Sequence, residues 1–299
     1  MSFATGMKTI VVATDLEGHS EAALEYARKL AGAYGARLVL AHGADPLKYA
    51  AVDTVPGRVL RGLSEEARGA LEEMTNDLVR EGIHSHTEVR QGEIVQMLLD
   101  VAKQYQAGLI VVGTRGNRGA GPVVVGSIAE QLVRRAGCPV LAVAADWNAG
   151  EYRPVPGGSV LLAMELNSAT QAAVDAAASL SETFHRTLLV IHARTAAEAS
   201  AFLNPCATTL EQFGVRVNAG FPVRCIVKDG HPADAIERAI AQYNPSILVA
   251  GVKRESTTAG PHGTIFSLLA RSRVPVLCVP ATAASEEHEK VTGISTGAL

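Results

Sequence analysis

The segment at residues 109–136, LIVVGTRGNRGAGPVVVGSIAEQLVRRA, places a glycine-rich loop between a short apolar run and a helix-like stretch. A strand, a loop and a helix in this order can hold a phosphate group, because glycines let the backbone approach phosphate oxygens and the first amides of a helix favour an anion. No Lys follows Gly126, so this is not a Walker A loop. The glycine count alone favours a plain surface loop, because glycine-rich loops without a binding role are common.

Alternating strands and helices extend to both sides of this segment. We expect strands at 8–13, 37–42, 86–89, 109–113 and 140–143, and helices at 20–34, 64–81, 93–105 and 127–136. The strands are short, continuous and rich in Val, Ile and Leu, as strands buried on both faces are. Ser20 and Ser64 are placed to cap their helices. The pattern predicts an α/β fold with a parallel sheet covered by helices on both faces.

The chain contains two copies of this pattern. KTIVVATDLEGHSEAALEYARKL begins at Lys8 and SVLLAMELNSATQAAVDAAASL begins at Ser159, and the second apolar run of each half ends in a histidine, His42 or His192. The halves also end alike, in GCPVLAV and RVPVLCV. A period this long indicates duplication of a whole domain. The predicted parts are domain 1 at 1–145, a linker at 146–158, domain 2 at 159–281 and a disordered tail at 282–299.

Composition and charge argue against several classes of protein. The formal net charge of the 299 residues is −3, which does not support nucleic-acid binding, and no apolar run is long enough for a transmembrane helix. The N-terminus lacks the pattern of a signal peptide. The four cysteines are scattered without a CxxC pair, which favours reduced thiols in a cytoplasmic protein. His84 and His86 lack a third ligand, so we expect no metal site, and no catalytic triad is present.

The position of the loop relative to the expected sheet is typical of a ligand site. Ligands of open α/β sheets bind beyond the carboxyl ends of the strands, where the strand order reverses. Asp15 follows the first expected strand and Gly113 ends the fourth, so both face one crevice if these strands are neighbours. Arg115 and Arg118 add positive charge and forked donors to the loop. Several charge-assisted hydrogen bonds to phosphate, each worth roughly 1.5–3 kcal/mol, are enough for micromolar binding.

The spacing of Gly113, Gly116 and Gly126-Ser127 fits G-x2-G-x9-G-(S/T). With the preceding LIVV and the following GCPVLAV, it resembles the ATP-binding subclass of the universal stress protein family. Because the resemblance in strands and helices extends over both halves, the chain resembles a tandem universal stress protein. The resemblance implies two Rossmann-like domains of the adenine nucleotide alpha hydrolase-like kind. Each would be a five-stranded parallel sheet of strand order 3-2-1-4-5, flanked by helices.

The resemblance also implies a nucleotide site in the first half. Its expected residues are Ala13, Thr14, Asp15, Gly43, Val112, Gly113, Arg115, Gly116, Gly126, Ser127, Ile128 and Ala129. In the family the Asp lies near the adenosine, and the last of these residues form the phosphate cradle. Many relatives have Val where Gly43 stands, so we expect a side-chain contact to be lost. Relatives often have Thr or Ser where Ala129 stands, so a hydroxyl donor is missing. ATP is the expected ligand, with or without Mg²⁺, and AMP or another adenine nucleotide stays open as the physiological ligand.

The second half departs from this motif. Its loop is GVKRESTTAGPHGT, in which Gly251 and Gly263-Thr264 match but Arg254 replaces the middle glycine. Glu165 stands where the first half has Asp15. A side chain at position 254 blocks close backbone approach. We expect that this half does not bind ATP in the family manner, although Lys253 and Arg254 leave open a smaller anion. GHPADAI at 230–236 is explained by helix capping alone.

The last strand of each half, Val140–Val143 and Val276–Val279, lies at a sheet edge that is normally covered or paired. Family dimers use this strand, so we expect an intramolecular pseudo-dimer and further homodimerisation. Three functions remain open: an ATP-binding regulatory module of the stress response, a slow ATPase or phosphotransfer enzyme, and a nucleotide-free interaction scaffold. With no general base or second acidic residue placed for hydrolysis, the sequence favours the module, with at most weak ATP hydrolysis.

Overall fold

The computed structural model describes residues 3–16, 18, 20–44, 57–114, 127–144, 158–164, 170–194, 220–252 and 263–281. By its internal contacts the chain divides into two compact units, residues 3–148 and 149–299. The predicted tail and, except for Gly158, the predicted linker lie outside the described residues. Within these described ranges, no helix has the length and hydropathy needed to cross a lipid bilayer.

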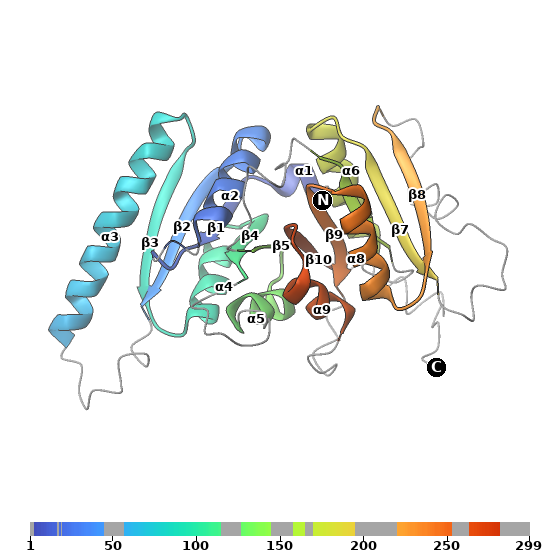
Figure 1. Ribbon diagram of the computed structural model, residues 1–299. Helices are drawn as coiled ribbons and strands as arrows, with labels where there is room; N and C mark the ends of the chain where they lie inside the picture. The colour runs from blue at the N-terminus through green and yellow to red at the C-terminus, as the bar shows by residue number, and fades with distance from the viewer. Residues whose placement is uncertain are drawn as a thin grey trace, which may run out of the picture. The chain divides into compact units, whose positions relative to one another are not determined.

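The first unit is a parallel α/β sheet with strand order β3-β2-β1-β4-β5. Its strands are β1 (Thr9–Ala13), β2 (Arg37–Ala44), β3 (Ser85–Gln91), β4 (Leu109–Gly113) and β5 (Val140–Val143). Its helices are α1 (Phe3–Gly6), α2 (Glu21–Tyr34), α3 (Gly57–Arg80), α4 (Ile94–Gln104) and α5 (Ser127–Arg135). The expected order 3-2-1-4-5 is therefore confirmed, and Figure 1 shows the strands side by side.

The second unit has the same arrangement, with strand order β8-β7-β6-β9-β10 and all neighbours parallel. Its strands are β6 (Val160–Ala163), β7 (Leu188–Arg194), β8 (Val223–Asp229), β9 (Ile247–Val252) and β10 (Val276–Pro280). Its described helices are α6 (Thr170–Thr183), α8 (Pro232–Tyr243) and α9 (Thr264–Arg271). The first pair of strands even keeps its register, with Thr9 opposite Arg37 in one unit and Val160 opposite Leu188 in the other.

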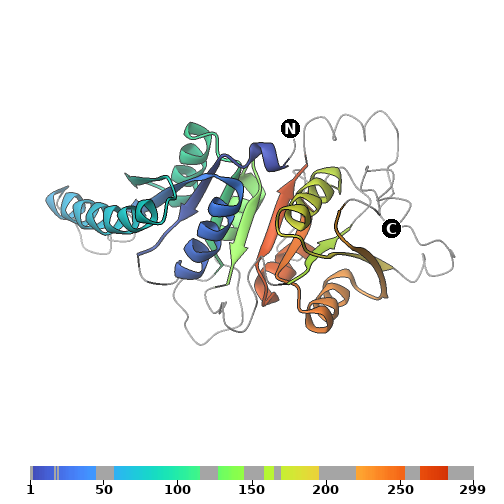
Figure 2. The same cartoon turned by 90° about the horizontal axis from the view of Figure 1, so that it is seen from above.

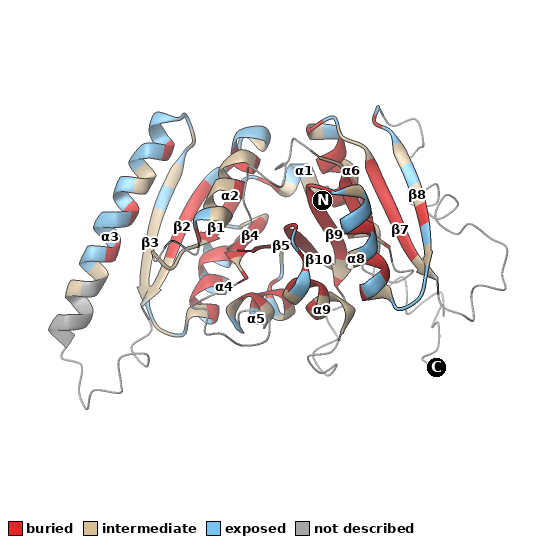
Figure 3. Cartoon of the chain, in the orientation of Figure 1, coloured by how far each residue is buried: buried red, intermediate tan, exposed pale blue. Residues whose placement is uncertain are grey.

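Helices cover both faces of each sheet, as Figure 2 shows, and the core lies between them and the strands. In the first unit α4 and α5 pack against each other, while α2 contacts β1, β2 and β4. Ile10, Val11 and Val12 of the central strand have no exposed surface. The edge strand β3 is half-buried along most of its length, which Figure 3 shows by colour. Burial on both faces explains why the inner strands are uninterrupted apolar runs.

Two helix starts differ from the sequence expectation. The helix α3 begins at Gly57, so Ser64 lies within it and accepts a hydrogen bond from Gln91 instead of capping a helix end. Ser20 does occupy the N-cap position of α2, but its side chain makes no capping hydrogen bond. Its backbone is helical, with φ −95° and ψ −1°, whereas a capping side chain normally needs extended backbone. The hydroxyl of Ser20 is therefore available for another partner.

Gly108, just before β4, allows a close approach of two backbone segments. Its amide donates to the carbonyl of Thr9 at 2.9 Å. A Cβ at this position would collide with the carbonyl group of Gly6 and lie 3.1 Å from Cα of Met7. The absent side chain thus lets the end of α1 lie against the start of β4.

Candidate functional site

The central strand β1 lies between β2 and β4, so the carboxyl ends of these three strands come together in the first unit. Ala13, which is paired with Ala41 of β2, ends β1, and Val112 and Gly113 end β4. Gly43 lies near the end of β2. The order reverses at β1, where the crevice of a doubly wound sheet is found. The structure therefore brings these predicted site residues to one place.

Asp15 leaves β1 into a small hydrogen-bond network. The hydroxyl of Ser20 donates to Oδ1 of Asp15 at 2.9 Å, and the amide of Asp15 lies 3.4 Å from the same hydroxyl oxygen. The hydroxyls of Thr14 and Ser20 are 3.0 Å apart. Since Ser20 gives its proton to the carboxylate, Thr14 is the donor in this pair. The Thr14 oxygen in turn accepts from the amide of Leu16 at 3.2 Å.

This network orients one carboxylate at the carboxyl end of the central strand. Leu16 holds a left-handed backbone, φ 62°, which is uncommon for a residue other than glycine. The turn directs the chain from β1 toward α2 while Ser20 reaches back to Asp15. Asp15 is half-buried rather than enclosed, so a ligand can still reach it.

Each unit has a histidine bound to the end of its central strand. Nδ1 of His42 lies 2.9 Å from the carbonyl oxygen of Thr14, and Nδ1 of His192 lies 3.3 Å from that of Met164, the two residues being 28 positions apart in both pairs. A carbonyl oxygen only accepts, so Nδ1 carries the proton in both rings. Both histidines hold the backbone in place, as expected for structural histidines.

Gly43 is covered by side chains from the start of α4. A Cβ at position 43 would lie 2.8 Å from Cε of Met97 and 3.2 Å from Cγ1 of Ile94. Met97 is buried and Ile94 is half-buried. Apolar atoms from another element thus take the space that a larger residue at 43 would occupy. The expected loss of a side-chain contact to the nucleotide at Gly43 stays a prediction.

The structure describes only part of the predicted phosphate cradle. Ser127 begins α5 and is exposed, and Ile128 is half-buried. Ala129 has no exposed surface, so its side chain belongs to the core. Arg115, Gly116 and Gly126 lie outside the described residues.

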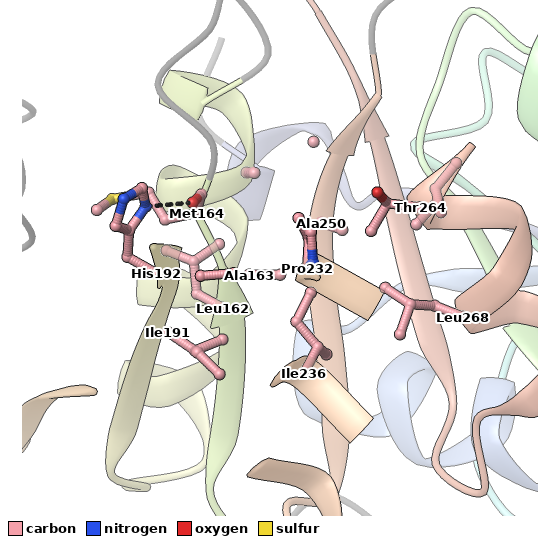
Figure 4. Close-up of a pocket in the computed structure, with 14 residues that line it drawn as sticks. Leu162, Ala163, Met164, Ile191, His192, Pro232, Ile236, Ala250, Thr264 and Leu268 are labelled. Atoms are coloured by element: carbon pink, nitrogen blue, oxygen red, sulfur yellow. Dashed lines mark hydrogen bonds between the residues drawn. The ribbon is translucent and has the colours of Figure 1, made fainter. Parts of the chain in front are cut away.

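In the second unit the equivalent crevice, at the ends of β6, β7 and β9, holds a pocket of about 80 Å³. Figure 4 shows the labelled side chains around it. Apolar side chains contribute most of the wall, namely Leu162, Ile191, Ile236 and Leu268. Polar atoms come from His192 and Thr264. Sequence analysis did not predict this pocket, because it depends on how small residues from several elements meet.

Other candidate groups have structural roles. GHPADAI at 230–236 covers the start of α8, with Pro232 in its first turn and Asp234 near the positive end of the helix. Burial raises the pKa of the Cys138 thiol to about 11 and raises that of Cys278 further, so neither is a nucleophile at neutral pH. In the described part of the chain, no group of three or more His, Cys, Asp or Glu residues is arranged to hold a metal ion.

Comparison with known proteins bears on these observations. A family model described as the universal stress protein family matches residues 6–144. A universal stress protein of Thermus aquaticus is 33% identical over 142 residues, which cover 46% of this chain and 98% of that protein. The chain belongs to the universal stress protein family. A second universal stress protein, from Methanocaldococcus jannaschii, is 30% identical over 138 residues, which cover 46% of this chain and 81% of that protein.

Solved structures extend the likeness in fold over most of the chain. A universal stress protein from Archaeoglobus fulgidus has a TM-score of 0.73 at 19% identity, covering 92% of this chain and 98% of that one. A universal stress protein from Pseudomonas aeruginosa has a TM-score of 0.66 at 19% identity, covering 97% of this chain and 99% of that one. At this identity the similarity shows the fold alone, an α/β sheet flanked by helices.

Proposed function

We propose that the first unit binds ATP and that the chain acts as a nucleotide-responsive regulatory module of the stress response. The observation that carries the proposal is the convergence of Asp15, Gly43 and Gly113 at the carboxyl ends of β1, β2 and β4, respectively. The G-x2-G-x9-G-S spacing links this crevice to the first turn of α5, whose amides favour an anion. Membership of the universal stress protein family supports the same reading.

In this proposal the carboxylate of Asp15, oriented by Ser20, accepts hydrogen bonds from the hydroxyl groups of the ribose. Arg115, Gly116, Gly126 and Ser127 hold the phosphates, and an Mg²⁺ ion accompanies them if the nucleotide carries one. Met97 and Ile94 provide apolar surface beside Gly43, where the base would rest. The residues present in the described part of the site therefore suit an adenine nucleotide.

We also propose that the second unit is a second universal stress protein domain that does not bind ATP in the family manner. Its strand order and register repeat those of the first unit. Met164 occupies the position that Thr14 has in the first unit. Methionine has no hydroxyl group, so the hydrogen bond between Thr14 and Ser20 beside Asp15 has no counterpart of the same form. The last strands β5 and β10 would pair the two domains as a pseudo-dimer, and we propose that the chain works in the cytoplasm as a homodimer.

An enzyme remains the alternative. Slow ATP hydrolysis requires a positioned water and charge stabilisation beyond binding. Asp15 lies at this end of the sheet, and its Oδ1 already accepts from Ser20. We therefore propose a binding module with at most weak turnover. Identification of the nucleotide released when the purified protein is denatured separates the two: ATP supports the module and ADP supports hydrolysis. Release of no nucleotide, with an unfolding temperature that added ATP does not change, supports the scaffold.

The decisive experiment is a calorimetric titration of ATP into wild type, Gly126→Val and Gly263→Val. Gly126→Val places a branched side chain in the phosphate approach, so binding should be lost. Gly263 is the matched control in the second unit, where, among the residues that the structure describes, a Cβ would meet only Phe266, at 3.6 Å. We expect Gly263→Val to keep wild-type affinity for ATP. Equal affinity in all three proteins would refute the cradle.

A further inference from the structure

The last strand of the first unit's sheet, β3, presents main-chain hydrogen-bonding groups at its outer edge. Leu38 of β2 is opposite Ser85, and the Leu38 amide donates to the carbonyl of His84 at 2.8 Å. In a parallel ladder of this register, the even-numbered residues of β3 bond to β2 and the odd-numbered ones point outward. Thr87 and Val89 therefore direct their amides and carbonyls to the edge, where no other described segment bonds to them. Such an edge is a template for a further strand.

The helix α3 runs beside β3 on one face of the sheet, as Figure 1 shows. The hydroxyls of Thr75 in α3 and Thr87 in β3 are 2.9 Å apart, and Ser85 donates to the carbonyl of Thr75 at 3.1 Å. At the other end of β3, Gln91 donates to Ser64 at 3.3 Å. The helix thus follows the whole length of β3 through side chains, and it does not use the outward main-chain groups of the strand.

One side of α3 points toward this outer edge. Glu81 follows α3, and its amide still donates to the carbonyl of Asp77 as in a helix. Its carboxylate pairs with Arg28 of α2 at 3.0 Å. Because α2 covers the inner strands of the sheet, the side of α3 that carries Glu81 faces inward. Residues two positions apart project from nearly opposite sides of a helix, so Val79 faces outward.

The outward side of α3 carries carboxylates. Glu65, Glu72 and Val79 are spaced seven residues apart, so they form one stripe along the helix. Val79 is 54% exposed, and both glutamates are exposed. Neither glutamate forms an ion pair within the described ranges, and neither does Arg68 between them. A strand added at the edge of β3 would therefore lie beside two carboxylates that have no cation bound to them in the described structure.

A second copy of the chain suits this edge poorly. Antiparallel pairing of β3 with itself requires a twofold axis perpendicular to the sheet, which places both α3 helices on the same face. The stripes with Glu65 and Glu72 would then face each other, and like charges oppose that contact. An extended peptide brings no helix of its own, so it leaves the carboxylates of α3 available to its side chains.

We propose that the outer edge of β3 binds a basic peptide segment of a partner protein as an added strand. Thr87 and Val89 form the main-chain hydrogen bonds with the peptide. Lysine side chains of the peptide reach Glu65 and Glu72, and the aliphatic part of one of them contacts Val79. This surface is separate from the proposed nucleotide crevice, because β2 lies between β3 and the central strand β1.

The test titrates the full chain with the acetylated and amidated peptide Lys-Thr-Lys-Thr-Lys-Thr-Lys, followed by amide NMR spectra and by hydrogen exchange. We expect saturable shifts with a dissociation constant on the order of 0.1–1 mM at low salt, and weaker binding as salt is added. With the peptide at about ten times its dissociation constant, exchange of the Thr87 and Val89 amides should slow about tenfold. The same peptide with glutamate in place of each lysine should bind at least about tenfold more weakly.

Three results would overturn the proposal. The first is equal binding of the two peptides, and the second is exchange of the Thr87 and Val89 amides that the basic peptide does not slow. The third is protection of these amides without peptide that increases with protein concentration, since a second copy would then occupy the edge.

Variants of the edge locate the contact. Val89→Pro removes one outward amide and no bond to β2, so the strand should stay folded and the peptide should bind at least about fivefold more weakly. Val89→Ala shortens the same side chain but keeps the amide, so it should retain binding. Unchanged binding in folded Val89→Pro contradicts the added strand.

A matched pair of double variants tests the stripe on α3. Glu65→Gln with Glu72→Gln should weaken the basic peptide about fivefold. Glu66→Gln with Glu73→Gln makes the same change of net charge one residue further along, turned about 100° away around the helix, and should weaken it less than about twofold. Equal effects of the two double variants would contradict the placement of the peptide beside this stripe.

Discussion

The hydroxyl of Ser20 donates a hydrogen bond to Oδ1 of Asp15 at 2.9 Å, from the first residue before α2 back to the end of the central strand. Ser20 is only 8% exposed, whereas Asp15 is half-buried and open to a ligand. A residue expected to cap a helix therefore orients the acidic group of the proposed nucleotide site. The same contact ties the turn after β1 to the helix that covers the sheet.

Replacing Ser20 with Ala should reduce both stability and ATP binding. A hydrogen bond to a charged group contributes roughly 1.5–3 kcal/mol. Because Asp15 is partly exposed, we expect the free energy of unfolding to fall by about 1.5 kcal/mol, the low end of this range. The affinity for ATP should fall about fivefold, because Asp15 is no longer oriented. Urea unfolding and calorimetry measure the two effects.

Thr75→Ala is the matched control for this change. It removes the hydrogen bond of another part-buried hydroxyl pair in the same unit, Thr75 of α3 and Thr87 of β3, which are 2.9 Å apart; β2 separates β3 from β1. We expect a similar loss of stability with unchanged ATP affinity. If Ser20→Ala binds ATP as tightly as Thr75→Ala does, the orientation of Asp15 is not needed for binding.

Gly43 and Met97 should be energetically coupled. Gly43→Ala places a Cβ 2.8 Å from Cε of Met97, and since the end of a methionine can move, we expect a cost of about 1 kcal/mol. Met97→Ala leaves a cavity and should cost about 2–4 kcal/mol. The double variant should be more stable than the sum of the two by about 1 kcal/mol, as measured by urea unfolding. Additive effects would show that the two positions do not interact.

Two glycines of the first unit should respond to alanine with opposite signs. At Gly108 a Cβ collides with the Gly6 carbonyl, and because backbone cannot move aside cheaply, we expect a loss of about 2–3 kcal/mol. At Gly69, inside α3, a Cβ meets nothing within 4 Å, so alanine should stabilise by roughly 0.5–1 kcal/mol. Thermal unfolding of both variants tests this. Destabilisation of Gly69→Ala to the same extent would contradict the packing argument.

Glu88 should make the stability of the first unit depend on acid pH. Burial alone raises its pKa, but hydrogen bonds from Tyr105 at 2.6 Å and Arg90 at 3.1 Å, with the charges of Arg90 and His86, outweigh burial and hold the pKa of Glu88 below its usual value of 4.5. A lowered folded pKa stabilises the protein above the unfolded pKa, and this contribution is lost as the pH falls through the folded pKa.

Urea unfolding of wild type and Glu88→Gln between about pH 6 and about pH 3 measures this contribution. The stability advantage of wild type should shrink as the solution becomes more acidic. Tyr105→Phe removes the main hydrogen bond that lowers the pKa of Glu88, so its pH dependence should lie between the two. Parallel curves for wild type and Glu88→Gln would show that Glu88 does not contribute.

Much of the fold was predictable, because strands that are buried on both faces appear in the sequence as uninterrupted apolar runs. Apolar runs such as Ile10–Val12 predicted inner strands, and the strand order implied by the family resemblance is the one observed. The start of α3 was misplaced by seven residues, from Gly57 to Ser64, because a serine before an apolar stretch satisfies the pattern of an N-cap whether or not a helix already runs through it.

The alternation of strands and helices, the repeated pattern of the two halves and the glycine spacing of the first loop could be read from the chain alone, since they depend on residue type and order. The three-dimensional structure was needed to show that Ser20 hydrogen-bonds to Asp15 instead of capping α2, that Met97 lies against Gly43, and that side chains of β6, β7, β9 and α9 form a pocket. Those contacts depend on side chains from separate elements meeting in space, which the order of residues along the chain does not predict.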